Sequence, residues 1–136
     1  MAFVLDASIA ASWALSDENE SAATAALART GGEVCVVPAL WWFEIRNSLL
    51  MAERLKRLTS AETSQFLHDL NDLKVNEDFS PDETDLLRLA RTHKLTAYDA
   101  AYLELARRQG VPLATLDEAL ARAARLERVF LIGYSS

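Results

Sequence analysis

Short apolar runs alternate along this chain with longer stretches in which hydrophobic residues recur three or four positions apart. The short runs are typical of strands in a parallel sheet, which are covered on both faces and therefore apolar throughout. The first run ends at Asp6, the run at 33–37 is followed by Pro38, and the run at 112–116 ends at Asp117. We predict strands at residues 3–5, 33–37, 73–75, 112–116 and 128–132.

The longer stretches have the spacing of amphipathic helices. Ser16 or Asp17 is the expected N-cap of one helix, and Ser80 followed by Pro81 at the first helical position is the expected start of another. Gly110 is expected to end the helix before it. We predict helices at residues 7–15, 17–29, 41–57, 60–70, 80–93, 96 or 98 to 108, and 118–126.

Strands that alternate with helices in this way indicate an α/β sandwich with a mostly parallel sheet. The length of 136 residues fits a single domain, residues 1–136, and is too short for two. Hydrophobic residues make up 51% and charged residues 25%, which is a globular composition.

Composition narrows the setting in which the protein works. No apolar run approaches the roughly 20 residues that a membrane helix needs, and the first residues lack the basic region of a signal peptide. Cys35 is the single cysteine, so an internal disulfide is excluded. We predict a cytoplasmic protein that does not bind membranes, with Cys35 buried in a strand.

Four acidic residues stand where strands end or helices begin. Asp6 and Asp117 directly follow predicted strands, and ligands of parallel sheets gather at the carboxyl ends of strands. Asp99 lies near a helix start, and Glu44 lies in an apolar stretch near another. Unpaired buried charge is costly, and a hard divalent cation with oxygen ligands is one way to compensate for it.

Each of these acids also has a purely structural interpretation. Asp6 and Asp117 could cap the helices that follow them. Asp99 could be a first-turn acid that the helix dipole favours, and Glu44 could pair with Arg46 or Arg54. Spacing alone does not decide between these interpretations and a metal site.

A larger set of residues, taken in order, resembles one family. The chain is similar over nearly its whole length to PIN-domain proteins, and more narrowly to the VapC-type toxins of bacterial and archaeal toxin–antitoxin pairs. The residues that carry this resemblance are Asp6 followed by Ala7-Ser8, Pro38 before a helix that holds Trp41, Glu44 and Asn47, then Leu95-Thr96-Ala97-Tyr98-Asp99-Ala100-Ala101-Tyr102-Leu103, and finally Leu113-Ala114-Thr115-Leu116-Asp117 and Leu120.

The resemblance implies a three-layer α/β/α sandwich whose four acids share one pocket. Asp6 and Asp99 would be the most direct ligands of Mg²⁺ or Mn²⁺, Glu44 would orient the metal or a water, and Asp117 would complete the site through water. Ser8 and Thr115 would position these groups. It also implies a metal-dependent endoribonuclease acting on a structured RNA such as tRNA or rRNA, a cognate antitoxin as partner, and a homodimer.

The charge balance is unusual for a protein that binds RNA. The chain has 14 Lys and Arg against 20 Asp and Glu, a net charge of −6, whereas phosphate contacts need cations. Setting the four candidate acids aside leaves 16 acidic against 14 basic residues. A bound divalent cation would supply positive charge where the phosphate lies.

Other residues carry weaker signals. We expect at least one of the adjacent Trp41 and Trp42 to lie in the core, and an exposed Trp13 or Trp41 to suit an antitoxin groove. His68 and His93 lack a zinc pattern and are expected on the surface or at a helix end. There are two small basic clusters: the first is Arg54, Lys56 and Arg57, and the second is Arg107 and Arg108. Each is either a solvent-exposed charged face or a contact for the RNA backbone.

Other protein classes share the α/β pattern. A haloacid-type phosphatase would need a second Asp where Ser8 stands, and a receiver domain would need a late Lys, but no Lys follows Lys94. Two alternatives stay open: a non-catalytic binding module on the same scaffold, and a PIN nuclease outside any toxin–antitoxin pair.

Overall fold

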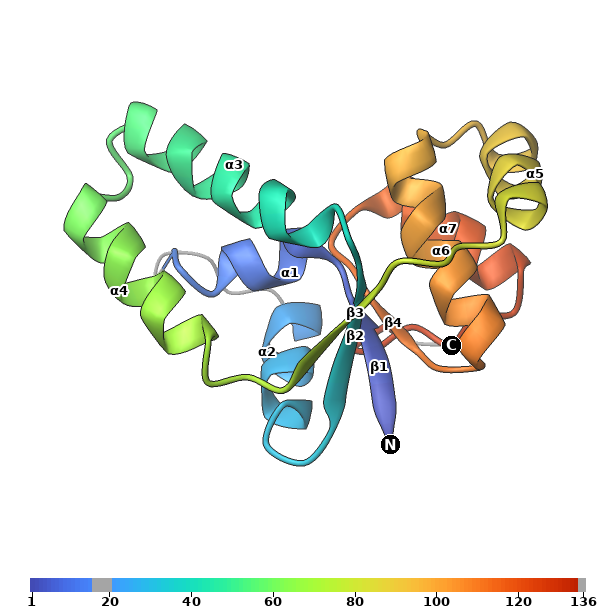
Figure 1. Cartoon of the computed structure of the whole chain (residues 1–136), viewed down its shortest axis with the longest axis horizontal. Helices are drawn as coiled ribbons and strands as arrows, with labels where there is room; N and C mark the ends of the chain where they lie inside the picture. The colour runs from blue at the N-terminus through green and yellow to red at the C-terminus, as the bar shows by residue number, and fades with distance from the viewer. Residues whose placement is uncertain (16–20, 135–136) are drawn as a thin grey trace.

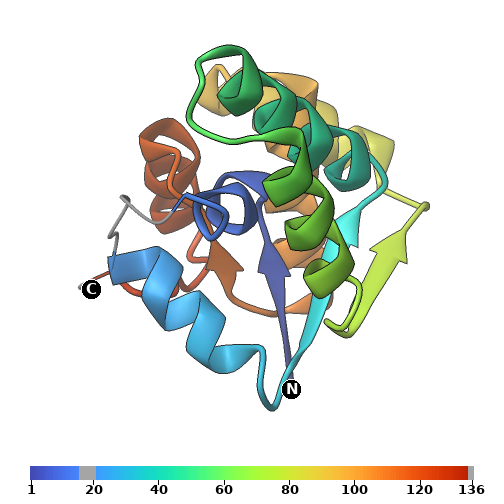
Figure 2. The same cartoon turned by 90° about the vertical axis from the view of Figure 1, so that its left-hand side faces the viewer.

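The computed structural model describes residues 1–15 and 21–134, and its centre is a four-stranded sheet. The strands are β1 (Ala2–Leu5), β2 (Val34–Pro38), β3 (Val75–Asp78) and β4 (Leu113–Ala114). Their order is β3-β2-β1-β4, and each neighbouring pair is parallel. Figure 2 shows the four arrows pointing the same way, so all the carboxyl ends lie at one edge of the sheet.

Helices cover both faces of the sheet, which confirms the predicted α/β fold and its layers. In Figure 1 the early helices lie on one side of the sheet and the late helices on the other. The early group is α1 (Ala7–Ser12), α2 (Ser21–Arg29), α3 (Trp41–Arg54) and α4 (Ser60–Leu70); the late group is α5 (Glu83–His93), α6 (Ala97–Gln109) and α7 (Glu118–Leu126).

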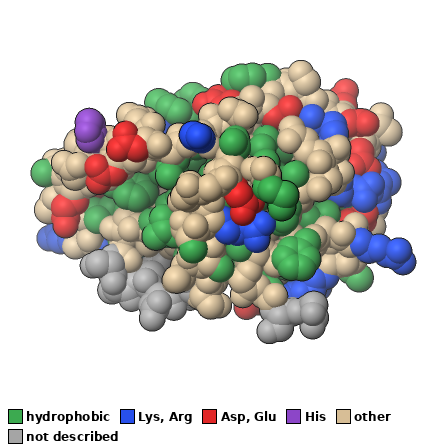
Figure 3. All heavy atoms as spheres, turned by 90° about the horizontal axis from the view of Figure 1, so that it is seen from below, with side chains coloured by type: hydrophobic (Ala, Val, Ile, Leu, Met, Phe, Trp, Pro, Cys, Tyr) green, Lys and Arg blue, Asp and Glu red, His purple; other side chains and the backbone are tan. Residues whose placement is uncertain are grey.

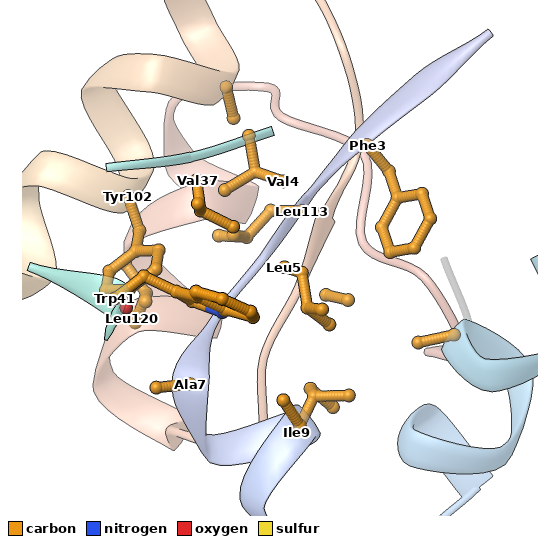
Figure 4. Close-up of a cluster of buried hydrophobic side chains, with 14 of the residues drawn as sticks. Phe3, Val4, Leu5, Ala7, Ile9, Val37, Trp41, Tyr102, Leu113 and Leu120 are labelled. Atoms are coloured by element: carbon orange, nitrogen blue, oxygen red, sulfur yellow. The ribbon is translucent and has the colours of Figure 1, made fainter. Parts of the chain in front are cut away.

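The central strand β1 explains why its sequence is apolar without alternation. Phe3, Val4 and Leu5 are all fully buried, because helices pack on both faces of this strand. Val4 pairs with Val36 of β2 and with Leu113 of β4. These strands and the helices over them form one continuous core (Figure 4).

Helix ends agree with the sequence at some positions and correct it at others. Thr96 caps α6 by accepting a hydrogen bond from the Asp99 N–H, and Gly110 ends the helix with a φ of 64°. The predicted start of α5 at Ser80 and Pro81 is wrong. Asp82 is the N-cap, since its side chain accepts from the Asp85 N–H, and the helix begins at Glu83. The proposed cap at Ser16 or Asp17 lies outside the described residues.

Two predicted strands are shorter than expected. The run 112–116 forms only the two residues of β4, so Asp117 lies three residues beyond the strand. The run 128–132 does not form a strand and makes a single bridge between Leu131 and Leu113. Backbone hydrogen bonds from Leu113 N–H to Phe130 and from Ile132 N–H to Leu113 hold it there. Because β4 is only two residues long, residues 128–132 have only a short strand edge to pair with. Strand β3 lies two residues further along the chain than predicted.

The late helices are joined by ion pairs that involve Arg88, Arg107 and Arg108. Glu127 lies 3.1 Å from Arg88, 3.2 Å from Arg107 and 2.6 Å from His93. Arg108 pairs with Glu104 at 2.6 Å and Asp78 at 2.7 Å. Figure 3 views the face at the amino ends of the strands and shows acidic and basic side chains close together toward this side. Both arginines of the Arg107–Arg108 cluster are therefore engaged within the protein.

The other basic cluster, formed by Arg54, Lys56 and Arg57, is exposed at and just beyond the end of α3. Among the residues that the structure describes, none of the helices combines the length and apolar character needed to cross a bilayer.

The ion pairs of Glu127 predict how stability depends on pH. They lower the pKa of Glu127 from 4.5 to about 2, with the Arg88 contact as the main cause. A depressed carboxyl pKa adds stability above the unfolded value, and this is lost as the pH falls through the folded value. We expect Glu127→Gln to lower the unfolding free energy by about 1 kcal/mol at pH 7.

Thermal melts measured by circular dichroism at several pH values would check this. The difference between Glu127→Gln and the wild type should shrink between pH 4.5 and about 2. Glu77→Gln, which removes an exposed carboxylate from β3, is the control and should change stability little. A constant difference over this pH range would contradict the role of the Glu127 charge.

Candidate active site

Asp6 follows the buried strand β1 and is itself only 6% exposed. Its Oδ2 accepts hydrogen bonds from the Thr115 hydroxyl at 2.6 Å and from the Ser8 hydroxyl at 2.8 Å. The side chain of Asp6 makes no capping hydrogen bond to α1, so capping does not explain this residue. Both hydroxyl donors converge on one oxygen of a carboxylate that has almost no access to water.

Ser8 and Thr115 also fix the chain around Asp117. The Thr115 hydroxyl accepts from the Asp117 N–H at 3.0 Å, and the Ser8 hydroxyl accepts from the Leu116 N–H at 3.0 Å. The Asp117 carboxylate accepts from the Leu120 N–H at 2.8 Å and caps α7. The structural interpretation of Asp117 as a cap is therefore confirmed, although its charge still acts on the other acids.

Glu44 is held by a partner that the sequence did not suggest. Its Oε1 accepts a hydrogen bond of 2.5 Å from the hydroxyl of Tyr102 on α6. The pairing with Arg46 or Arg54 considered from the sequence is wrong: Arg46 lies over the Trp42 ring at 3.6 Å and Arg54 contacts Met51. Glu44 is half-buried in the first turn of α3.

Asp99 occupies the first turn of α6, where the Thr96 cap fixes the backbone. Its carboxylate is half-buried and lies one helical turn before Tyr102. The helix-dipole interpretation of Asp99 agrees with this position, but its electrostatic surroundings are those of the other acids and not of an isolated helix end.

The four acids influence each other, which shows that the fold brings them to one region. Burial, and then the charge of Asp117, raises the pKa of Asp6 against the hydrogen bonds from Thr115 and Ser8. Burial raises the pKa of Glu44 despite the Tyr102 hydrogen bond, with further contributions from Asp6 and Asp99. Burial and the charges of Asp117 and Asp6 raise the pKa of Asp99. We call Asp6, Glu44, Asp99 and Asp117 the carboxylate cluster.

The cluster is open enough that it does not form a closed metal cage. Within residues 1–15 and 21–134, no three His, Cys, Asp or Glu side chains are placed to hold one metal ion directly. An all-oxygen donor set of mutually repelling carboxylates still fits a hard divalent cation, because Mg²⁺ uses few protein ligands and keeps several waters. One or two of these acids would therefore hold such a cation directly, and the others would contact it through water.

A groove with a volume of about 330 Å³ lies between α1 and α3. Its lining residues include Ser8, which contacts Asp6, and the apolar Leu15, Met51 and Leu55. Trp13 and Trp41 do not supply the exposed indole expected for such a groove. Trp41 is 5% exposed, Trp13 is half-buried with its indole N–H donating to Ala23, and the exposed tryptophan is Trp42. The expectation that one of the adjacent pair lies in the core is confirmed.

Tyr102 is the one contact of the cluster that sequence reasoning missed. It stands three residues after Asp99, so the helical repeat places both on neighbouring turns of α6. A separation of three residues indicates that both side chains lie on one face of the helix. It did not single out Tyr102, because many other residue pairs of α6 have a similar separation. Its partner Glu44 lies 58 residues away, on a different element.

Comparison with known proteins agrees with this architecture. The sequence model of the PIN domain matches residues 3–126. The structure of PAE2754 from Pyrobaculum aerophilum is similar with a TM-score of 0.67 and 26% identity, over 90% of this chain and 87% of that one. FitAcB from Neisseria gonorrhoeae has the same fold, with a TM-score of 0.64 and 16% identity over 96% of each chain. No curated protein matches the sequence. Since the family match covers most of its length, the chain belongs to the PIN-domain family.

Proposed function

We propose that this protein is a metal-dependent endoribonuclease whose active site is the carboxylate cluster. PIN domains are generally nucleases, and this chain has the PIN fold. The observation that carries the proposal is that the fold buries the Asp6 carboxylate at the end of β1 and half-buries Glu44 and Asp99 near it. Burial and the neighbouring acids raise the pKa of all three carboxyl groups. Burying several carboxylates side by side weakens the fold unless something compensates their charge, and perturbed acids of this kind gather at functional sites.

Each acid has a distinct part in the proposed reaction. Asp6 is the fixed anchor, because Thr115 and Ser8 hold its Oδ2 and leave its other oxygen for a ligand. Asp99 lies on α6, and the negative charges of Asp117 and Asp6 act on its carboxylate. Mg²⁺ or Mn²⁺, when bound, lowers the pKa of a water and neutralises charge on the phosphoryl group. Glu44, whose Oε1 accepts the hydrogen bond from Tyr102, would orient a water through its second oxygen.

The remaining acid, Asp117, and the hydroxyls of Ser8 and Thr115 complete this arrangement. Asp117 uses one oxygen to cap α7, so it acts on the pocket through its charge and through water. Thr115 ties Asp117 to Asp6 by accepting from one residue and donating to the other. Ser8 and Thr115 therefore position the acids without taking part in the chemistry themselves.

RNA as the substrate rests on the resemblance to VapC-type toxins, with tRNA and rRNA as the structured targets. Three arginines of the late helices, Arg88, Arg107 and Arg108, form internal ion pairs. The exposed basic residues at and just beyond the end of α3, namely Arg54, Lys56 and Arg57, are candidates for phosphate contacts.

We further propose that the protein is the toxin of a toxin–antitoxin pair, cytoplasmic and homodimeric. A segment of the antitoxin would lie in the groove between α1 and α3, where Leu55 is 66% and Met51 47% exposed. A PIN nuclease without an antitoxin and a non-catalytic binding module are the alternatives. The first shares the chemistry of the cluster and lacks the partner, and the second lacks both the metal dependence and the cleavage.

The cleavage reaction tests the cluster directly. Purified wild-type protein should cleave RNA in Mg²⁺ or Mn²⁺, lose this activity in EDTA and regain it when metal is restored. Asp99→Asn keeps the shape of the side chain and removes its charge, so we expect at least a hundredfold slower cleavage. Asp72→Asn makes the same change at an exposed site after α4 and should leave the rate unchanged. Full activity in folded Asp99→Asn would end the assignment.

The repulsion within the cluster also predicts a stability effect. Raised carboxyl pKa values mean that the folded state loses stability as the pH rises through them, so at pH 7 the ionised cluster destabilises the fold. Without metal, Asp99→Asn should melt about 2–4 °C higher than the wild type. Mn²⁺ should raise the melting temperature of the wild type and have a smaller effect on the variant. The opposite order in differential scanning calorimetry would contradict mutual repulsion.

Growth experiments separate the toxin from a nuclease without an antitoxin. Induction of the wild type in a bacterial host should arrest growth and produce mapped RNA ends that Asp99→Asn does not produce. Co-expression of a small reading frame encoded upstream should restore growth. Leu55→Asp, which places a charge in the apolar groove, should weaken that neutralisation and leave cleavage by the purified protein intact. Cleavage in vitro without growth arrest would favour a nuclease outside a toxin–antitoxin pair.

A further inference from the structure

One buried hydroxyl contacts the carboxylate cluster from inside the core. Tyr102 is fully buried, and Figure 4 shows it among the core side chains with Trp41 and Leu120. Its hydroxyl donates to Glu44 Oε1 at 2.5 Å. Burial, and then the charge of Asp6, raises the pKa of this hydroxyl. Tyr102 also lies on α6, which carries Asp99.

The contact with Glu44 fixes where the hydroxyl proton points. A carboxylate oxygen can only accept, so the hydroxyl proton lies on the Glu44 side. A fully buried hydroxyl in this position cannot turn to water, so it holds one oxygen of Glu44 at a fixed place beside α6.

We propose that Tyr102 is a positioning residue that sets the placement of Glu44 relative to Asp99 and thereby the affinity of the site for its divalent cation. The inference rests on the proposed function. Tyr102 touches neither the metal nor the RNA in this scheme, and it acts only through Glu44. It is the counterpart of Thr115: one hydroxyl ties Asp6 to Asp117, and the other ties Glu44 to the helix that carries Asp99.

The competing interpretation is that Tyr102 only fills the core. A tyrosine in that role needs its ring and would be replaced by Phe with little effect on the site. The geometry favours positioning, because a purely apolar role would be served without a hydroxyl that must find a partner inside the protein. The two interpretations differ in what Tyr102→Phe does to metal binding.

A double-mutant cycle read by Mn²⁺ binding distinguishes them. The variants are Tyr102→Phe, Glu44→Gln and the double variant, each titrated with Mn²⁺ by isothermal calorimetry without RNA. We expect Tyr102→Phe to weaken Mn²⁺ binding by about tenfold, the effect typical of losing a group that orients a ligand. Adding Tyr102→Phe to Glu44→Gln should change the Kd by less than about twofold, because the hydroxyl acts through Glu44.

Two controls separate positioning from general loss of stability. Tyr98→Phe removes a hydroxyl from a 64% exposed tyrosine of the same helix and should leave the Mn²⁺ Kd unchanged. Ile132→Val trims a residue that is 2% exposed, at the bridge beyond α7, and should lower the melting temperature without altering Mn²⁺ binding. Melting curves of every variant without metal show that each is folded at the temperature of the titration.

The outcomes separate the two proposals. Wild-type affinity for Mn²⁺ in folded Tyr102→Phe, or full additivity with Glu44→Gln, overturns the positioning role and leaves the proposed nuclease intact. A wild-type protein that binds no Mn²⁺ and cleaves no RNA overturns both. Selective weakening in Tyr102→Phe that disappears in the Glu44→Gln background supports the positioning role.

Discussion

The burial of the Asp6 carboxylate at the end of the central strand is the constraint on which the site depends. A strand covered on both faces delivers whatever follows it into the interior, and here that residue is an acid with 6% exposure. Such a charge needs donors. Thr115 comes from just beyond β4, the neighbouring strand, and Ser8 from the first turn of α1. The hydrogen bonds to this one carboxylate therefore join the end of β1, the start of α1 and the segment after β4. They also bring the backbone that leads to Asp117 close to Asp6.

The same solution leaves a second problem, because hydroxyl donors do not neutralise charge. Asp6, Glu44 and Asp99 each have a raised pKa, with burial as the largest cause and neighbouring acids adding to it. A fold selected for stability alone would replace one of them by an amide or an apolar residue. Retaining all of them makes physical sense if the cluster is ordered for a cation. The protein would then gain on metal binding the stability that it lacks without metal.

The sequence was informative where a feature depends on local pattern. The apolar run before Asp6, the Thr96 cap and Gly110 at the end of α6 each follow from residues that are neighbours in the chain. Features that depend on a distant partner were missed. Residues 128–132 have a strand-like composition, but their neighbour β4 is two residues long and allows only one bridge. The start of α5 is a local feature that was also missed, because Asp82 and not Ser80 accepts the hydrogen bond from the Asp85 N–H.

The site shows the same division. Asp6, Glu44, Asp99 and Asp117 were chosen by position and by resemblance, and their mutual electrostatic effects are consistent with one cluster. Their roles remain a proposal. The Glu44–Tyr102 contact was beyond sequence reasoning, because arginines two and ten residues along the same helix were the obvious partners. Arg46 instead lies on the Trp42 ring, which removes it from competition for Glu44.

In the proposed function, the acidic character of the chain links metal binding to substrate binding. The chain has a net charge of −6, and the Arg88, Arg107 and Arg108 side chains are already paired with acids, so part of its positive charge is engaged within the protein. An empty carboxylate cluster would repel the RNA backbone, whereas an occupied one would attract it. Linkage then requires the reverse effect as well: RNA that binds the occupied site must raise the affinity for the cation by the same factor. Groups such as Tyr102 that set the cation affinity would therefore also set the affinity for RNA, without contacting it.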